Sequence, residues 1–340
     1  MRVVTVRNVS QAWARLSDTL RGSELQDTSA GPAWVVDTPV VTVYERPTER
    51  VLFCPARNAN PFFHLMEALW MLAGRCDSAF LDRYVADFGS RFAESDGTIH
   101  GAYGRRWRHT MGFDQLEVAV QKLRANPNDR QVVIQMWDAR GGNDLRGQWR
   151  DRPCNTHVYL RVRGKAPHDG TLVLDLTVLC RSNDAVWGAY GANAVHFSVL
   201  QEYLAARIGV RVGRMYQFSN NFHVYQDVWS KMRPSDAQTA DAEEVTLGCV
   251  PMFDAPEAID RDLEQFMDWH MNLWGGGADR RHLYHNSWFN HTAERVARSW
   301  FSLRGVRSID AAMAGAMAIG CPAWHAACVE WLQRLHDRTR

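Results

Sequence analysis

A cysteine and an arginine that the predicted fold brings together are the residues with the clearest chemistry. Cys154 follows Pro153 in a polar stretch, and Arg181 directly precedes Ser182. A guanidinium beside a thiol favours the thiolate, which is the reactive nucleophile. A guanidinium also contacts two phosphate oxygens while a neighbouring hydroxyl donates to a third. These residue types indicate covalent chemistry on a phosphorylated small molecule.

Four other polar residues stand where a core, a strand or a helix end is expected, and each also has an ordinary structural explanation. Glu67 lies in an apolar helix, where it either pairs with a basic group or shuttles protons. His223 and Tyr225 share one face of a strand, either as half-buried strand residues or as ligands of a sugar hydroxyl. Asn193 either caps a helix or reads the edge of a pyrimidine base.

The predicted secondary structure places these residues. Residues 156–163 and 171–179 alternate or are rich in β-branched residues, so we expect a hairpin with Cys154 before its first strand and Arg181 after its second. Glu67 belongs to a buried helix over residues 61–74, and Asn193 precedes a buried helix that ends at Gly209. Further strands at 34–36, 40–44 and 131–137 favour one α+β domain over residues 1–340, with a helical C-terminal extension at about 235–340.

Composition excludes several classes of protein. The formal net charge of +1 argues against a broad basic surface for nucleic acid, so no nucleic-acid partner is expected. No apolar run reaches the roughly 18 residues of a membrane span, and the N-terminus does not resemble a signal peptide. The 7 cysteines include no CxxC pair, which argues against a disulfide framework or a metal site. We therefore expect a cytoplasmic enzyme without membrane contact.

Several short motifs occur in the order, and at nearly the spacing, of the thymidylate synthase family. The chain resembles this family over roughly residues 45–230, and residues 181–193 look closer to its phage and antibiotic-pathway branches, which include pyrimidine nucleotide hydroxymethylases. The resemblance implies a thymidylate synthase-like α+β fold, in which a mixed β-sheet packs with helices and one sheet face forms a homodimer interface. The motifs are Tyr103-Gly104-Arg105-Arg106-Trp107-Arg108, Asp129-Arg130, Pro153-Cys154, Arg181-Ser182-Asn183-Asp184, Gly188 with Asn193, and His223-Val224-Tyr225.

The resemblance also implies a role for each candidate residue. Cys154 would add to C6 of a pyrimidine nucleoside monophosphate and make C5 nucleophilic towards 5,10-methylenetetrahydrofolate, the co-substrate. The implied catalytic residues are Cys154, Glu67 and Tyr103 for proton transfer, and Asn193 for reading the base. The implied ligands are Arg46, Arg181 and Ser182 for the 5′-phosphate, Arg130 for the phosphate in the neighbouring subunit, His223 and Tyr225 for the ribose, and Asp184, Arg57 and Trp70 for the folate.

Three departures from the synthase pattern favour hydroxymethylation over methylation. Asn155 follows the nucleophile where synthases usually carry His, residues 80–88 lack the shielding tryptophans of synthases, and residues 332–340 are charged rather than apolar. An exocyclic methylene that water reaches becomes a hydroxymethyl group, whereas a sealed one accepts hydride and becomes a methyl group. The amide of Asn193 suits uracil, and after a flip it also suits cytosine.

The sequence therefore favours a folate-dependent pyrimidine nucleotide 5-hydroxymethylase acting on CMP or dCMP through a Cys154–C6 adduct. Three alternatives remain. The enzyme acts on dUMP, either as a thymidylate synthase or as a dUMP hydroxymethylase; the chain is a non-catalytic nucleotide- or RNA-binding relative; or it is an unrelated hydrolase that uses Cys154. The motif order and the outward offset of His157 from Cys154 along its strand argue against the hydrolase.

Overall fold

The computed structural model describes residues 1–140, 143–164, 171–232, 247, 249–277 and 282–339. The chain divides into two compact units. The expectation of a single domain over residues 1–340 stays a prediction. Unit 1 comprises Met1–Ala59, Arg106–Gly147 and Pro153–Thr246, and unit 2 comprises Asn60–Arg105, Gln148–Arg152 and Leu247–Arg340.

Unit 1 contains two mixed β-sheets. Each sheet combines parallel and antiparallel neighbours, which confirms the predicted α+β class with a mixed sheet, while the dimer interface stays a prediction. The larger sheet has the order β1 (Arg2–Val6), β4 (Val40–Tyr44), β9 (Arg211–Ser219), β7 (Val173–Cys180), β6 (Asn155–Arg163) and β5 (Val133–Gln135). The smaller sheet has the order β2 (Glu24–Thr28), β3 (Gly31–Val35), β10 (Phe222–Tyr225) and β8 (Asn183–Asp184).

The predicted hairpin is confirmed as β6 and β7. The two strands pair antiparallel from Asn155 opposite Cys180 to Arg163 opposite Val173, with an irregular register between Asn155 and His157. Residues 165–170 of the expected turn lie outside the described residues. Since the hairpin continues to Cys180, the residues that flank it at 154 and 181 lie at the same end of the sheet.

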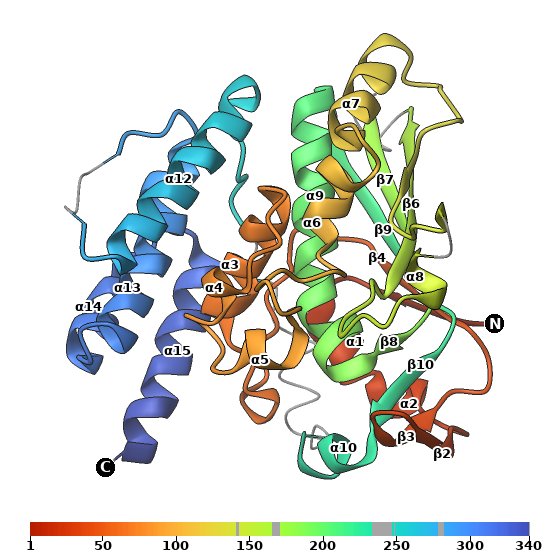
Figure 1. Ribbon diagram of the computed structural model, residues 1–340, viewed down its shortest axis with the longest axis horizontal. Helices are drawn as coiled ribbons and strands as arrows, with labels where there is room; N and C mark the ends of the chain where they lie inside the picture. The colour runs from red at the N-terminus through yellow and green to blue at the C-terminus, as the bar shows by residue number, and fades with distance from the viewer. Residues whose placement is uncertain (141–142, 165–170, 233–246, 248, 278–281, 340) are drawn as a thin grey trace. The chain divides into compact units, whose positions relative to one another are not determined.

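Helices cover the central strands of the larger sheet. α9 (Asn193–Ile208) packs on β7 and β9, and α7 (Gln115–Ala125) packs on α9 (Figure 1). Nearly every residue of α9 is buried, and the helix ends at Gly209, whose φ of 87° suits a residue without a side chain. The other described helices of unit 1 are α1 (Val9–Ala14), α2 (Leu16–Thr19), η1 (Pro55–Arg57), η2 (Arg106–Thr110), α8 (Asn143–Arg146), η4 (Ala185–Ala192) and α10 (Gln226–Met232).

Unit 2 is built around α3 (Pro61–Leu72). The carboxamide of Asn60 accepts from the Phe63 backbone N–H and Pro61 occupies the first turn, so the helix begins with its caps in place. Every residue of α3 except Phe63 is buried. The helices that pack on α3 are α4 (Ser78–Leu81), α6 (Tyr103–Arg105), α13 (Glu294–Arg304) and α15 (Pro322–Thr339), and the remaining ones are α5 (Phe88–Phe92), η5 (Pro256–Ala258), α12 (Ile259–Trp274), η6 (Phe289–Ala293) and α14 (Ile309–Met317).

Aromatic rings join the C-terminal helices to α3. The ring of Phe62 lies 5.2 Å from that of Trp300 and 5.8 Å from that of Trp331, between centroids. Tyr84 stacks on Trp300 at 5.5 Å. The helical C-terminal region that the sequence predicts is therefore part of the same core as residues 60–105, and its expected start near residue 235 lies outside the described residues.

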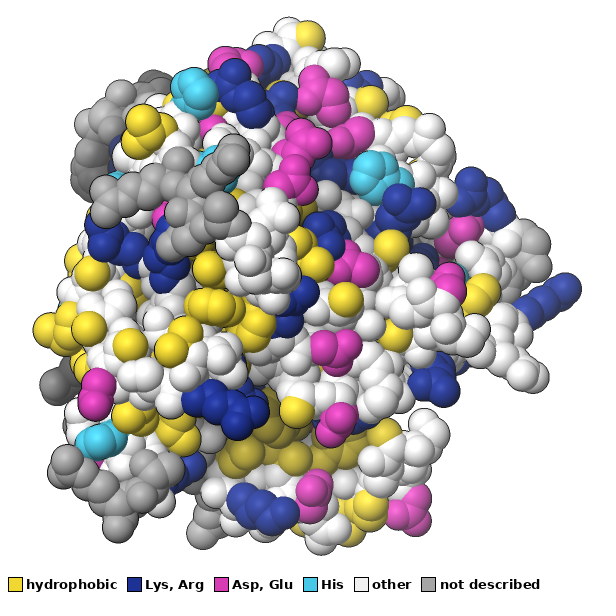
Figure 2. Space-filling view, turned by 60° about the vertical axis from the view of Figure 1, so that its left-hand side comes forward, with side chains coloured by type: hydrophobic (Ala, Val, Ile, Leu, Met, Phe, Trp, Pro, Cys, Tyr) yellow, Lys and Arg dark blue, Asp and Glu magenta, His cyan; other side chains and the backbone are white. Residues whose placement is uncertain are grey.

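The surface carries both signs of charge. On the face shown in Figure 2, basic and acidic side chains are interspersed, in keeping with the net charge of +1. Among the described helices, none combines the length and the apolar character that crossing a membrane requires.

Candidate active site

Cys154 and Arg181 meet at one end of the β6–β7 hairpin, as the sequence predicts. Cys154 is half-buried directly before β6. The backbone N–H of Arg181 donates to the Cys154 carbonyl at 2.8 Å, and its Nε donates to the Pro153 carbonyl at 3.1 Å. The guanidinium also lies 5.7 Å from the ring centroid of Trp137. These contacts fix the arginine next to the candidate nucleophile.

A second cysteine at the same place cannot replace Cys154. Cys180 is fully buried at the end of β7, and burial raises the pKa of its thiol well above the ordinary value. The negative charge of a Cys154 thiolate would raise the Cys180 pKa further, because the two sulfurs lie close together. Of the two neighbouring thiols, Cys154 is therefore the one that is accessible for reaction.

The two predicted ribose ligands lie on β10. β10 runs parallel to β8, with His223 opposite Asp184. Burial raises the pKa of Tyr225, and the nearby acidic groups of Asp184 and Cys154 raise it further. Tyr225 is therefore within electrostatic range of both the nucleophile and the predicted folate ligand.

His223 has an orienting partner that sequence reasoning missed. Its Nδ1 donates to the Asn221 side-chain oxygen at 2.8 Å, and its ring meets that of Tyr225 edge to face at 5.3 Å. His223 is 7% exposed, so these contacts fix the orientation of its buried ring. Asn221 stands two residues before His223 in the sequence, and this spacing was the available signal.

Asp184 combines a structural contact with a carboxylate oxygen that has no described partner. Its Oδ1 caps η4 by accepting from the backbone N–H groups of Val186 and Trp187 at 2.8 and 2.5 Å. Its Oδ2 is buried and forms no hydrogen bond within the described part of the chain. Burial raises the pKa of this carboxyl, although the Trp187 and Val186 amides and the charges of His223 and Arg57 lower it.

Arg57 and Trp187 lie beside Asp184. The Nε of Arg57 donates to the Val186 carbonyl at 3.0 Å, and its guanidinium lies 4.4 Å from the Trp187 ring centroid. Burial lowers the Arg57 pKa to about 10. Trp187 is 47% exposed and was not predicted as a site residue. Together the three residues offer a flat aromatic surface next to a hydrogen-bond acceptor.

Asn193 is not a helix cap, so this alternative is wrong. The N-cap residue of α9 is Ala192, and no side chain caps this helix. The Nδ2 of Asn193 instead donates to the side-chain oxygen of Asn183 at 3.0 Å. The sequence places Asn183 in the Arg181–Asp184 motif, but its contact with Asn193 was not foreseen because ten residues separate them.

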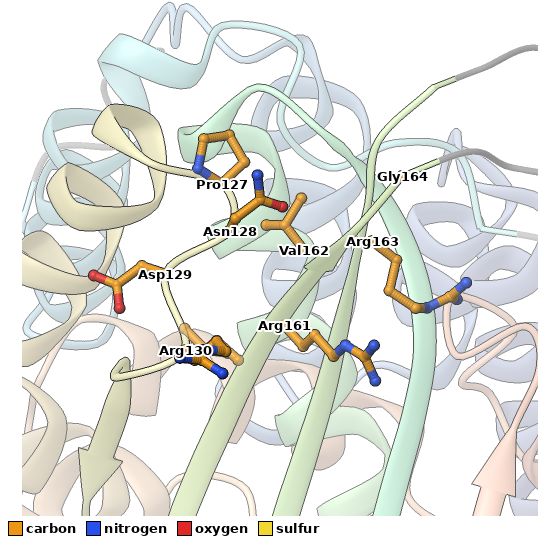
Figure 3. A pocket seen from close by; sticks show the side chains of 9 residues that line it. Pro127, Asn128, Asp129, Arg130, Arg161, Val162, Arg163 and Gly164 are labelled. Carbon is orange, nitrogen blue, oxygen red and sulfur yellow. The ribbon is translucent and has the colours of Figure 1, made fainter.

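The remaining predicted phosphate ligands of unit 1 lie at three places. Ser182 is half-buried next to Arg181, and Arg46 is exposed after β4, where its backbone N–H donates to Arg7. Arg130 is exposed at the end of the turn that follows α7. Figure 3 shows it beside β6, in a pocket of about 700 Å³ lined by residues 127–130 and 160–164. This pocket contains Arg161 and Arg163 but not Cys154.

The other three candidates belong to unit 2. Glu67 is 7% exposed on α3, and Tyr103 is half-buried at the start of α6. A Cβ atom on Gly104 would lie 1.7 Å from the Met71 carbonyl oxygen, so only glycine allows α6 to approach the end of α3 this closely. Trp70 is 1% exposed, and its indole N–H donates to the Asp77 carbonyl at 3.1 Å. Among the described residues, no group of His, Cys, Asp or Glu side chains could hold a metal ion.

Comparison with known proteins identifies the family. Residues 57–248, more than half of the chain, match the family described as Thymidylate synthase. The chain belongs to the thymidylate synthase family. This match includes every candidate site residue except Arg46, and it confirms the resemblance that the motifs indicate.

Named relatives of this thymidylate synthase family member include phage enzymes. A deoxyuridylate hydroxymethyltransferase of Pseudomonas phage M6 is 46% identical over 235 residues, which are 69% of this chain and 64% of the relative. One of Bacillus phage SP01 is 36% identical over 59% of this chain and 52% of the relative. A thymidylate synthase of Streptococcus gordonii is 30% identical over 51% of this chain and 62% of the relative. The chain thus spans about half to two thirds of the length of these proteins.

Asn155 lies within the family match and directly follows Cys154. The side chain is fully buried, and neither its oxygen nor its nitrogen has a hydrogen-bond partner within the described part of the chain. A buried carboxamide without partners costs on the order of 1–3 kcal/mol, so a bound water or ligand group is the usual way to satisfy it. Asn155, which replaces the His that synthases usually carry, thus offers hydrogen-bonding groups without a partner among the described residues directly beside Cys154.

Proposed function

We propose that the protein is a deoxyuridylate 5-hydroxymethylase, which transfers a one-carbon unit from 5,10-methylenetetrahydrofolate to C5 of dUMP and adds water to it. The observation that carries this proposal is the 46% identity to a phage protein named for that reaction. A dUMP hydroxymethylase is one of the alternatives that the sequence leaves open. The relatives named here favour it over the CMP or dCMP reaction, since two of them are deoxyuridylate hydroxymethyltransferases.

The contacts around Cys154 support covalent catalysis. The Cys154 sulfur forms a bond to C6 of uracil, and the electron pair of the C5–C6 double bond moves to C5. Arg181 and Ser182 bind the 5′-phosphate, because the guanidinium is held beside the nucleophile by its bonds to Pro153 and Cys154. From β10, the His223 Nε2 accepts from a ribose hydroxyl, because its Nδ1 donates to Asn221, and the Tyr225 hydroxyl donates to the ribose. We propose further that Arg46 binds the same phosphate, and that Arg130 serves the nucleotide of a second subunit.

The later steps balance with water as the second reactant. C5 bonds to the one-carbon unit and loses its proton, a transfer that we assign to Tyr103 and Glu67. Release of tetrahydrofolate leaves a methylene group on C5, water adds to it, and departure of the Cys154 sulfur restores the double bond. The products are 5-hydroxymethyl-dUMP and tetrahydrofolate. Asn155 supports this outcome, because its buried amide has no partner among the described residues and suits an ordered water.

The residues near Asp184 fit the folate co-substrate. The buried Oδ2 of Asp184 has no described partner and would accept from an N–H of the pterin ring. Trp187, held by Arg57, offers a flat surface for that ring. The folate supplies the one-carbon unit at the oxidation level of formaldehyde. Trp70 is more deeply buried, and its predicted folate contact remains a proposal.

The product distinguishes this proposal from its alternatives. Purified protein is incubated with methylenetetrahydrofolate and dUMP, dCMP or CMP, and each product is weighed by mass spectrometry. We expect a hydroxymethyl product from dUMP and no absorbance rise from dihydrofolate. A methyl product with dihydrofolate would identify a thymidylate synthase. A hydroxymethyl product only from CMP or dCMP would instead support the cytidine monophosphate hydroxymethylase that the sequence favours.

A second measurement tests the binding-only alternative. Loss of tritium from C5 of labelled dUMP requires the adduct at C6, so it reports Cys154 chemistry without turnover of the folate. We expect release by the wild-type protein. Release no faster than that of Cys154→Ser would indicate a nucleotide-binding relative instead.

A further inference from the structure

We infer that Asn183 and Ser219 determine the base preference by fixing the orientation of the Asn193 carboxamide. This inference rests on the proposed function, in which Asn193 reads the pyrimidine. Asn183 and Ser219 act as positioning residues, since they reach the base only through Asn193.

The three side chains form one buried chain of hydrogen bonds in unit 1. Asn193 Nδ2 donates to Asn183 Oδ1 at 3.0 Å, and Asn183 Nδ2 donates to Ser219 Oγ at 3.0 Å. As whole residues, Asn193, Asn183 and Ser219 are 6%, 2% and 1% exposed. Since water cannot replace these partners, the direction of each bond depends on that of the next.

The backbone holds the middle of this chain in place. The backbone N–H of Asn183 donates to the Asn221 carbonyl at 2.9 Å, and Asn183 pairs with Phe222 across β8 and β10. A Cβ atom on Gly188 would lie 2.6 Å from Asn183 Oδ1 and 3.2 Å from Asn193 Nδ2. Glycine at position 188 therefore makes room for the contact between the two carboxamides, which indicates that this contact is a built feature of the fold.

Asn193 keeps one recognition edge available. One of its two N–H groups is used by Asn183, and the described residues supply no partner for its Oδ1. The oxygen and the second N–H form an edge with one acceptor and one donor. Uracil offers a donor at N3 and an acceptor at O4, whereas cytosine offers an acceptor at N3 and a donor at N4. The two bases therefore require opposite orientations of the same carboxamide.

The chain makes this orientation costly to reverse. If Asn193 alone flips, its oxygen faces the Asn183 oxygen, and the buried Asn183 oxygen loses its donor. Losing a bond of this kind should weaken binding of the mismatched base about tenfold. A complete reversal requires Asn183 to flip as well and the Ser219 hydroxyl to change from acceptor to donor. Asn193 alone could bind either base. Because reversing its orientation requires all three groups to turn, the chain makes Asn193 selective for one base.

The test measures the ratio of the dissociation constants of dCMP and dUMP by titration calorimetry. Ser219→Ala removes the end of the chain, and Asn183→Leu removes its middle with little change in volume. We expect each to reduce the wild-type ratio about tenfold towards unity. Ser219→Thr keeps the hydroxyl and should restore the ratio. Asn220→Leu, an exposed carboxamide in the neighbouring turn, is the matched control and should leave the ratio unchanged.

The outcomes separate this inference from the proposed function. If Ser219→Ala and Asn183→Leu weaken both nucleotides equally, the residues are merely structural and the inference is wrong. If the wild-type protein binds dCMP more tightly than dUMP, the proposed function is wrong, while a shift of the ratio in the variants still supports the hydrogen-bond chain. Binding of neither nucleotide by folded wild-type protein would overturn both. Ser219→Ala keeps the test decisive if Asn183→Leu does not fold.

Discussion

The two units of the molecule bury ionisable groups in different ways. In unit 1, Arg106 donates to both oxygens of Asp144 at 2.6 and 2.9 Å, and Arg50 pairs with Glu202, with all four side chains buried. In unit 2, the buried carboxylate of Asp262 accepts from the backbone N–H groups of His285 and Asn286 and from the Asn286 side chain, and buried His270 bonds to the Tyr84 hydroxyl at 2.6 Å. In these examples unit 1 pairs buried carboxylates with buried guanidinium groups, whereas unit 2 satisfies Asp262 mainly through backbone and carboxamide donors. Unit 2 also contains a buried carboxylate, Glu294, that pairs with the half-buried Arg298.

This difference matches what each unit positions. Several residues predicted to bind the nucleotide lie on or beside strands of unit 1 or at the start of α9. There, directional bonds to Pro153, Asn183 and Asn221 set the orientation of single side chains. Glu67 and Tyr103 instead lie on α3 and α6, whose positions depend on how closely whole helices pack. Changes in unit 1 should therefore act through individual polar groups, and changes in unit 2 through packing and protonation.

The largest effect is expected from the nucleophile of unit 1. Cys154→Ser should reduce tritium release from C5 of dUMP by about 10³-fold or more, because a serine hydroxyl is not ionised by a neighbouring guanidinium at neutral pH. Cys76→Ser, which changes a half-buried thiol in unit 2, is the control and should keep the wild-type rate. Equal rates for the two variants would remove Cys154 from the reaction.

The next largest effect should be a loss of folding stability when the buried ion pair between Arg106 and Asp144 in unit 1 is broken. Asp144→Ala leaves the Arg106 guanidinium buried at 1% side-chain exposure without its counter-charge, and we expect a loss of about 3–5 kcal/mol in the free energy of unfolding. Asp18→Ala removes a carboxylate from an exposed pair with Arg21 in the same unit and should cost less than about 1 kcal/mol. Urea unfolding of both variants measures the difference, and similar losses would contradict the role assigned to burial.

A single methyl group should disrupt the helix packing of unit 2. Gly104→Ala places a carbon 1.7 Å from the Met71 carbonyl oxygen, a backbone atom that cannot move alone. We expect a loss of about 3 kcal/mol, at the upper end of the usual cost of overpacking. Gly164→Ala is the control, because the added carbon meets no atom of the described residues within 4 Å. Hydrogen exchange should report the loss in α3 and α6, and wild-type protection there would refute the close approach.

Elements with strong local signals could be predicted from the sequence. The β6–β7 hairpin, α3 with its initial proline and α9 with its terminal Gly209 all appear where alternation, capping and glycine placed them. The strand expected at 131–137 is shorter, at Val133–Gln135. The packing of the C-terminal helices on α3 could not be predicted, because aromatic contacts such as Phe62 with Trp300 join residues that are far apart in the sequence and leave no local pattern.

The site shows the same limit at the level of single residues. Cys154 and Arg181 could be paired from the hairpin, since both flank strands whose register the alternation predicts. The contacts of Asn183 with Asn193 and of Asn221 with His223 could not, because they depend on how β8 and β10 come together. Residue types indicate the chemistry that the site can perform, but only the tertiary structure shows which polar side chains form hydrogen bonds with one another.

The smallest effect we predict concerns the acid sensitivity of unit 2. Burial lowers the pKa of His270 from an ordinary value of 6.5 to about 3. The unfolded chain therefore binds a proton in a range where the folded protein does not. The free energy of unfolding is therefore unaffected by protonation of His270 above pH 6.5, and it decreases as the pH falls from 6.5 towards 3. Between pH 7 and pH 5 the free energy of unfolding should fall by about 2 kcal/mol.

In unit 1, the pKa of Asp138 lies near 2 because Arg140 donates to it. The stabilising contribution of this carboxylate is therefore lost only as the pH falls below the ordinary pKa of 3.8.

Hydrogen exchange at pH 7 and pH 5, corrected for the intrinsic exchange rates, tests whether unit 2 opens first. Protection should fall in α12 of unit 2 before it falls in β7 of unit 1. His270→Gln removes the titrating group but keeps an acceptor for the Tyr84 hydroxyl, so the difference in unfolding free energy between the two pH values should shrink by about 2 kcal/mol. His109→Gln, at an exposed histidine of unit 1, should leave that difference unchanged. If His270→Gln keeps the full pH dependence, another group is responsible, and the contrast between the two units does not arise from this buried imidazole.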